Sequence, residues 1–97
     1  MAEVITNEVP TEDNSIIVLG AESWCQPCRQ FAPVFKRAAE DHTGDIKFYK
    51  VDIEESPELA IKYGVQSVPT VIRAVGGELE RIEERRPMPF LRYVQSQ

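Results

Sequence analysis

Cys25 and Cys28 are the only two cysteines in this chain of 97 residues, and they stand three positions apart in the motif Cys-Gln-Pro-Cys. Two thiols at this spacing can close a disulfide without moving the rest of the chain. A chain that places both of its cysteines in one such motif more often runs redox chemistry than stabilises a fold with them. The pair therefore predicts thiol–disulfide exchange.

The residues around the pair predict a buried strand that leads into a helix. Ser15–Ala21 is expected to be a central strand, because its apolar run Ile16–Leu19 is rich in β-branched residues and is typical of a strand buried on both faces. Apolar residues recur at helical spacing from Cys25 to His42, so Cys25 falls at a helix N-terminus. Unpaired backbone N–H groups and the helix dipole stabilise a thiolate there. We expect the pKa of Cys25 to lie below the free value of about 8.5, and Cys25 to be the attacking thiol.

Cys28 lies one helical turn further along, on the same side as Phe31 and Phe35. We expect it to be more buried than Cys25 and to resolve the mixed disulfide by attacking the sulfur of Cys25. Pro27 falls in the first turn of the helix, where a missing N–H group has little effect.

Two other uses of the cysteines compete with redox chemistry. A closed zinc site needs four ligands, whereas the chain offers two cysteines and the single His42, so no metal is expected. A purely structural disulfide would close a very small loop and would remove little entropy from the unfolded chain. Redox catalysis remains the favoured interpretation.

The composition limits the classes of partner and the number of domains. A chain of 97 residues is long enough for one domain, which we assign to residues 1–97. A net charge of −5 argues against binding to nucleic acid or to anionic membranes. No apolar run is long enough to cross a bilayer, and the first residues lack the features of a secretory signal. We therefore expect a cytoplasmic monomer with no nucleic-acid or membrane partner.

The order of the remaining elements predicts an α/β fold with a mixed central β-sheet and helices on both faces. Pro33 lies inside the long helix and is expected to kink it. The other expected elements are an edge strand at Val4–Thr6, a loop at Asn7–Asn14, strands at Ile46–Ile53, Val68–Val75 and Glu78–Glu84 with a hairpin turn at Gly76–Gly77, a helix from Ser56 to Gly64, and a helix at Pro89–Gln95.

With these motifs together, the chain resembles the thioredoxin family over roughly residues 15 to 95. The segment from Trp24 to Cys28 matches the family motif Trp-Cys-Gly-Pro-Cys, with Gln26 in place of the glycine. Further matches follow without gaps: Pro33 falls on the helix-kinking proline, Lys50 on the strand lysine beside the active site, Tyr63–Val65 on the Tyr-Gly-Val segment, and Val68–Thr70 on the cis-proline loop.

The resemblance implies a thioredoxin fold and a role for each matched residue. Pro69 would be cis and lie against the cysteine pair, leaving the backbone of Val68 to pair with a substrate peptide, while Thr70 completes that loop. Trp24, Gln26 and Pro27 would contact the substrate together with Val68 and Pro69. An exposed indole beside the nucleophile, such as that of Trp24, is a common interface anchor.

The activity implied is protein-disulfide reduction by the Cys25–Cys28 pair, with no bound cofactor. Disulfide-containing client proteins would be the substrates. A separate thioredoxin-reductase-like enzyme, an NADPH-dependent flavoenzyme by resemblance, would return the electrons.

The chain also departs from the family outside this motif. The family's buried aspartate aligns with Leu19, or with Val18 if Ser23 is an insertion, so Lys50 must reach water or another carboxylate. Glu83–Arg86 is charged where the family carries a glycine, and Asn7–Asn14 is too short for the family's first helix, which should be missing or shortened.

These departures keep two other functions open and predict a slow step. The chain could be a redox-dependent partner-binding module, or a more oxidising disulfide donor, because the residues between the cysteines tune the potential. Without a carboxylate at Leu19, we expect resolution by Cys28 to limit turnover at neutral pH unless Glu22 or another nearby carboxylate takes the proton.

Overall fold

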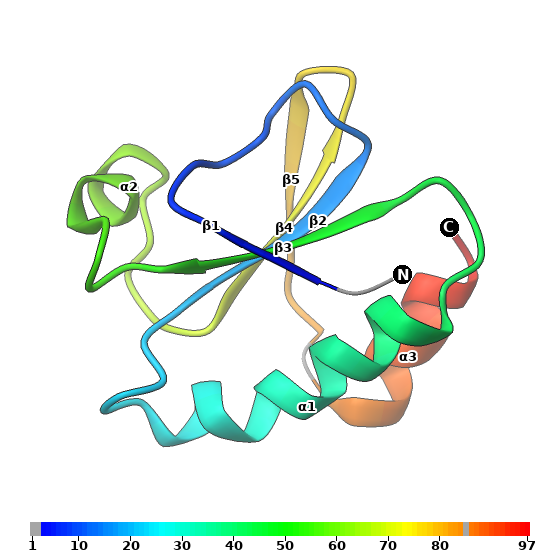
Figure 1. Ribbon diagram of the computed structural model, residues 1–97, viewed down its shortest axis with the longest axis horizontal. Coiled ribbons are helices and arrows are strands. Elements are labelled where there is room, and N and C mark those ends of the chain that lie inside the picture. The colour runs from blue at the N-terminus through cyan, green and yellow to red at the C-terminus, as the bar shows by residue number, and fades with distance from the viewer. Residues whose placement is uncertain (1–2, 85) are drawn as a thin grey trace.

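A computed structural model describes residues 3–84 and 86–97 of the chain. A five-stranded sheet in the order β1-β3-β2-β4-β5 forms its centre, and α1 and α3 lie together at one side while α2 lies apart from them (Figure 1). The strands are β1 (Val4–Thr6), β2 (Ser15–Gly20), β3 (Lys47–Asp52), β4 (Thr70–Val75) and β5 (Glu78–Ile82), and the helices are α1 (Gln26–Asp41), α2 (Pro57–Lys62) and α3 (Pro87–Gln95).

The sheet is mixed, as the sequence predicted. β1 and β2 both run parallel to β3, whereas β4 runs antiparallel to β2 and β5. The parallel half places the C-terminal end of β2 next to the N-terminus of α1, which is where the two cysteines lie.

Alternation along β2 divides the core into two layers. Ile16 and Val18 face α1 and α3, where they pack with Phe35 and other apolar residues of both helices. Ile17 and Leu19 face the opposite side and pack in a second core that includes Leu59 of α2. The predicted placement of helices on both faces is therefore confirmed.

Aromatic side chains hold α1 against the sheet and α3. The ring of Phe31 meets Phe90 of α3 at 5.0 Å, and the ring of Phe35 meets Phe48 of β3 at 5.6 Å, both in edge-on geometry. Edge-to-face pairs of this kind stabilise beyond the burial of their area. They set the position of α1, and with it the position of the cysteines at its start.

No helix precedes β2 in the part of the chain that the structure describes, so the first helix of the family is missing here. The loop of residues 7–14 lies over the second core instead, with Val9 packed against it. The Tyr49 hydroxyl donates a hydrogen bond of 2.7 Å to Asp13, which ties this loop to β3.

Several element ends differ from the predicted ones for local reasons. β4 begins at Thr70 rather than at Val68, because the intervening proline has no N–H group for the sheet. α3 begins at Pro87 rather than at Pro89, because a proline is well suited to a first helical turn. β1 has the expected bounds, and β2, β3 and β5 are each one or two residues shorter than expected. Pro33 lies inside α1.

Candidate active site

Cys25 is the N-cap of α1, directly before its first residue Gln26. The backbone N–H of Cys28 donates to Cys25 Sγ across 3.2 Å, and Pro27 occupies the first turn. The two cysteines form a disulfide with their Cα atoms 5.2 Å apart. When the bond is reduced, that N–H group and the helix dipole both favour a negative charge on the Cys25 sulfur.

The loop before β4 brings a second segment against the pair. The peptide bond between Val68 and Pro69 is cis, as the resemblance implied. The carbonyl oxygen of Val68 lies 3.7 Å from Cys25 Sγ, although the two residues are 43 positions apart. The Thr70 hydroxyl donates to the carbonyl of Ser67 at 2.6 Å and holds the loop in place.

An open pocket lies over Cys25 and gathers most of the residues expected to contact substrate, whereas Pro69 lines the neighbouring groove. Trp24, Gln26, Pro27 and Val68 all line it together with Cys25. Trp24 is 62% exposed, so its indole presents a flat apolar surface to solvent beside the sulfur. This arrangement fits an extended peptide chain lying across Cys25.

Burial does not distinguish the two cysteines, contrary to our expectation. Cys25 is 5% exposed and Cys28 is 4% exposed. The difference lies in what each residue borders: Cys25 borders the open pocket beside Trp24, whereas Cys28 borders an inner cavity with Phe31. The expected roles therefore rest on access and on the helix cap, not on the extent of burial.

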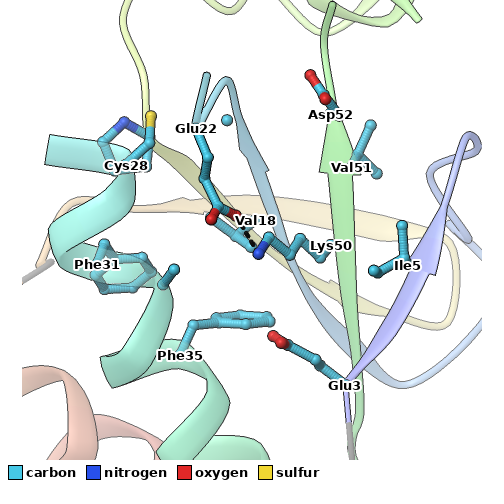
Figure 2. Close-up of a pocket in the computed structure, with 13 residues that line it drawn as sticks. Glu3, Ile5, Val18, Glu22, Cys28, Phe31, Phe35, Lys50, Val51 and Asp52 are labelled. Carbon is cyan, nitrogen blue, oxygen red and sulfur yellow. Dashed lines mark ion pairs between the residues drawn. The ribbon is translucent and has the colours of Figure 1, made fainter. Parts of the chain in front are cut away.

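The structure corrects the position of the missing acid. Leu19 is fully buried in the second core, on the sheet face away from α1, and cannot lie beneath Cys28. Val18 lies on the α1 face, lines the inner cavity with Cys28, and is the register partner of Lys50 on β3 (Figure 2). The alternative alignment, with Ser23 as an inserted residue, is therefore the one that the fold supports.

Lys50 has a carboxylate partner, but this partner does not stand at the position of the family's buried aspartate. Its ammonium forms an ion pair with Glu22, which stands in the loop between β2 and α1 (Figure 2). Arg29 Nη1 donates to the carbonyl of Glu22 at 2.9 Å, and the Ser23 hydroxyl donates to Glu54. The sequence suggests Glu22 only as a substitute for the missing acid, since nothing in the spacing alone brings a loop residue to Lys50.

The charged segment that replaces the family glycine reaches the edge of the site. Arg86 lines a groove with Pro27 and Pro69, and its guanidinium contacts Glu84 at 2.8 Å. Hydrogen bonds from the Arg86 side chain and backbone lower the pKa of Glu84 to about 2. This carboxylate is therefore charged at neutral pH. Arg85 lies outside the described residues.

The described residues offer neither a metal site nor a membrane-spanning helix. Among them, no three histidine, cysteine, aspartate or glutamate side chains gather as a metal site would require. None of their helices has the length and apolar character needed to cross a membrane.

Comparison with known proteins identifies the protein family. The thioredoxin family profile matches residues 2–95, and the chain belongs to the thioredoxin family. It is 42% identical over 76 residues to Thioredoxin M4, chloroplastic, of Arabidopsis thaliana, covering 78% of this chain and 37% of that protein. It is 38% identical over 76 residues to Thioredoxin 1 of Nostoc sp., covering 78% of this chain and 66% of that protein.

The fold matches solved thioredoxin structures. A mutant thioredoxin from Halobacterium salinarum superimposes with a TM-score of 0.80 at 25% identity, covering 98% of this chain and 89% of that one. The chain spans about a third to a half of the length of the first chloroplastic relatives that it matches, 37% of one and 52% of another.

These relatives also overturn one expectation. Proteins from Arabidopsis thaliana, Pisum sativum and Oryza sativa that match this chain are named as chloroplastic. The predicted cytoplasmic location is therefore wrong. It rested on the absence of a visible signal at the start of the sequence, which does not identify a compartment.

Proposed function

We propose that this chain is a thiol–disulfide oxidoreductase that reduces disulfides in client proteins. The observation that carries the proposal is the Cys25–Cys28 pair at the start of α1, with Cys25 facing an open pocket and the Val68 carbonyl. The family relationship supports it, because relatives that match most of this chain are named thioredoxins.

The geometry supports a two-step exchange. The Cys25 thiolate attacks one sulfur of a client disulfide, so the client's sulfur–sulfur bond breaks, and the first client sulfur leaves as a thiolate. Cys28 then loses its proton and attacks Cys25 Sγ, which releases the second client thiolate and forms the Cys25–Cys28 disulfide. The client gains two electrons, and the cysteine pair is oxidised.

We further propose that the electrons come from a separate reductase and that the chain binds no cofactor of its own. An NADPH-dependent flavoenzyme is the candidate that the family resemblance suggests. The purified chain would then sustain NADPH oxidation, followed at 340 nm, only when such a reductase and a disulfide client are both present.

Reduction of insulin by dithiothreitol tests the activity directly. The wild-type chain in catalytic amounts should accelerate the appearance of turbidity from the released insulin chains, and Cys25→Ser should abolish the acceleration. A wild-type rate equal to that of dithiothreitol alone would contradict the proposal. Equilibration of the pair with glutathione separates a reductase from an oxidising donor, because a donor would remain largely reduced at the same glutathione ratio.

A redox-dependent binding module is the second candidate, because Arg86, which is paired with Glu84, lines the groove beside Pro27 and Pro69. Misplaced or unpaired charges reject partners that do not complement them. This candidate predicts that a specific partner is captured while insulin turnover stays at the background rate.

A further inference from the structure

An inner cavity on the α1 side of the sheet is lined by the resolving cysteine and by ionisable side chains. It has a volume of about 290 Å³, and Cys28, Glu22 and Lys50 all line it. Gly20 completes the wall beside the sulfur, where an added Cβ would lie only 3.3 Å from Cys28 Sγ. The missing side chain at Gly20 therefore keeps the space next to that sulfur open.

Glu22 is held in this cavity from two sides. Its carboxylate is paired with the ammonium of Lys50, and its backbone carbonyl accepts a hydrogen bond from Arg29. In the view of Figure 2, the Glu22 side chain lies between Cys28 and Lys50. The side chain of Glu22 is 39% exposed and that of Lys50 is 26% exposed, so a proton on the carboxylate has a short way to solvent.

The cavity is polar enough to hold water. Glu3 points into it from the start of the described chain, and its Oε2 atom is buried with no hydrogen-bond partner among the described residues (Figure 2). Buried polar atoms without a protein partner are normally satisfied by water, and this volume exceeds what one water needs. Water in the cavity would connect the Cys28 thiol to the Glu22 carboxylate.

We propose that Glu22 is the proton acceptor for Cys28 during resolution, and that Lys50 is the positioning residue that holds it. The inference rests on the proposed function, because it concerns that function's second step. The Cys28 thiol passes its proton through water to Glu22, and the thiolate attacks Cys25 Sγ. The bond between Cys25 and the client sulfur breaks, and the released client thiolate takes a proton from solvent.

The charges around the carboxylate suit this role. Lys50 and Arg29 face Glu22 with positive charge, while Glu3 and Asp52 face the same cavity with negative charge. The Glu22 carboxylate is thus held by a cation beside the cavity that Cys28 also lines, and resolution should already be fast at pH 7. Without it, resolution depends on hydroxide and should accelerate steadily as pH rises.

Stopped-flow reaction of the reduced protein with one equivalent of 5,5′-dithiobis(2-nitrobenzoate) separates the two steps at 412 nm. Attack by Cys25 releases the first nitrothiobenzoate, and resolution by Cys28 releases the second. Glu22→Gln should slow the second phase about tenfold or more at pH 7, as expected for loss of a general base, and leave the first phase within about twofold. The variant's second phase should then recover as pH rises.

Glu55→Gln is the matched control, because Glu55 is exposed on the neighbouring loop after β3 and its loss changes the net charge equally. It should leave both phases unchanged. Lys50→Gln keeps the carboxylate but removes its anchor, so it should slow the second phase less than Glu22→Gln does. Circular dichroism and urea unfolding confirm that each variant is folded.

Three results would overturn the assignment: an unchanged second phase in Glu22→Gln, equal slowing in Glu55→Gln, or a larger effect of Lys50→Gln than of Glu22→Gln. Failure of the proposed function looks different. In that case the wild-type protein would show no reaction of Cys25 with the reagent, or no turnover of insulin, whatever the effect of Glu22.

Discussion

An acid introduced at Val18 should be tolerated far better than the same acid at Leu19, although the two residues are adjacent and both are buried. Leu19→Asp loses a fully buried leucine, worth about 1.5–3 kcal/mol, and places a carboxyl group among apolar residues of the second core. Burial of a polar group without a partner costs about 1–3 kcal/mol more in mutational data. The free energy of unfolding should therefore fall by about 2.5–6 kcal/mol, a large part of the total for a small domain.

Val18→Asp loses a somewhat smaller contribution of apolar burial to the free energy of unfolding, because valine is smaller than leucine. Its carboxylate faces the ammonium of Lys50 across the β2–β3 register. A hydrogen bond to a charged group returns about 1.5–3 kcal/mol, so the net loss should be about 0–2 kcal/mol. A difference of about 2 kcal/mol between the variants corresponds to roughly 8 °C or more in Tm for a domain of this size.

Thermal and urea unfolding of the oxidised proteins at pH 7 measure the difference. Val18→Asn and Leu19→Asn are the controls, since they carry the same polar shape without the charge. Val18→Asn should be less stable than Val18→Asp, because only the aspartate can pair with Lys50. Equal stability of the two aspartate variants, or a less stable Val18→Asp, would refute this assignment of the two residues to opposite faces of β2.

Three further predictions concern the site and the loop above the second core. Cys28→Ser should accumulate a mixed disulfide between Cys25 and client proteins, seen by mass spectrometry. Only substitution of Cys25 itself should abolish labelling at that residue. Trp24→Ala should raise the KM for a protein disulfide about tenfold, as for an interface anchor, with little change toward a small aromatic disulfide. Tyr49→Phe should lower the free energy of unfolding by about 1 kcal/mol, because the hydrogen bond to Asp13 is lost. That hydrogen bond, burial and the Asp13 charge raise the pKa of Tyr49, so the wild-type advantage is complete below about pH 10 and is lost as pH rises through the raised pKa. Urea unfolding between pH 8 and 11 should show this alkaline loss in the wild type and not in Tyr49→Phe.

Much of the fold follows from local patterns that the sequence displays directly. The apolar run of β2, the helical spacing after Cys25 and the glycine pair before β5 each predict an element by periodicity or by turn chemistry. The cysteine motif predicts its own disulfide because the two thiols are three residues apart. These features are set by residues close together in the chain, so the sequence displays them directly.

The surroundings of the cysteines were decided by tertiary structure. Whether Val18 or Leu19 faces Cys28 depends on which alternate residues of β2 point toward α1. The sequence does not decide this, because the loop before Trp24 can be aligned with or without one inserted residue. The equal burial of Cys25 and Cys28 depends on the cis-proline loop, which arrives from 43 residues away. The ion pair of Lys50 with Glu22 joins a strand to a loop, and no spacing rule links those positions. The redox pair and the order of the elements follow from residues that are close together in the chain. Only the packing of α1 on the sheet decided which carboxylate lies near the second sulfur, because side-chain reach and strand phase are set by contacts distant in the chain.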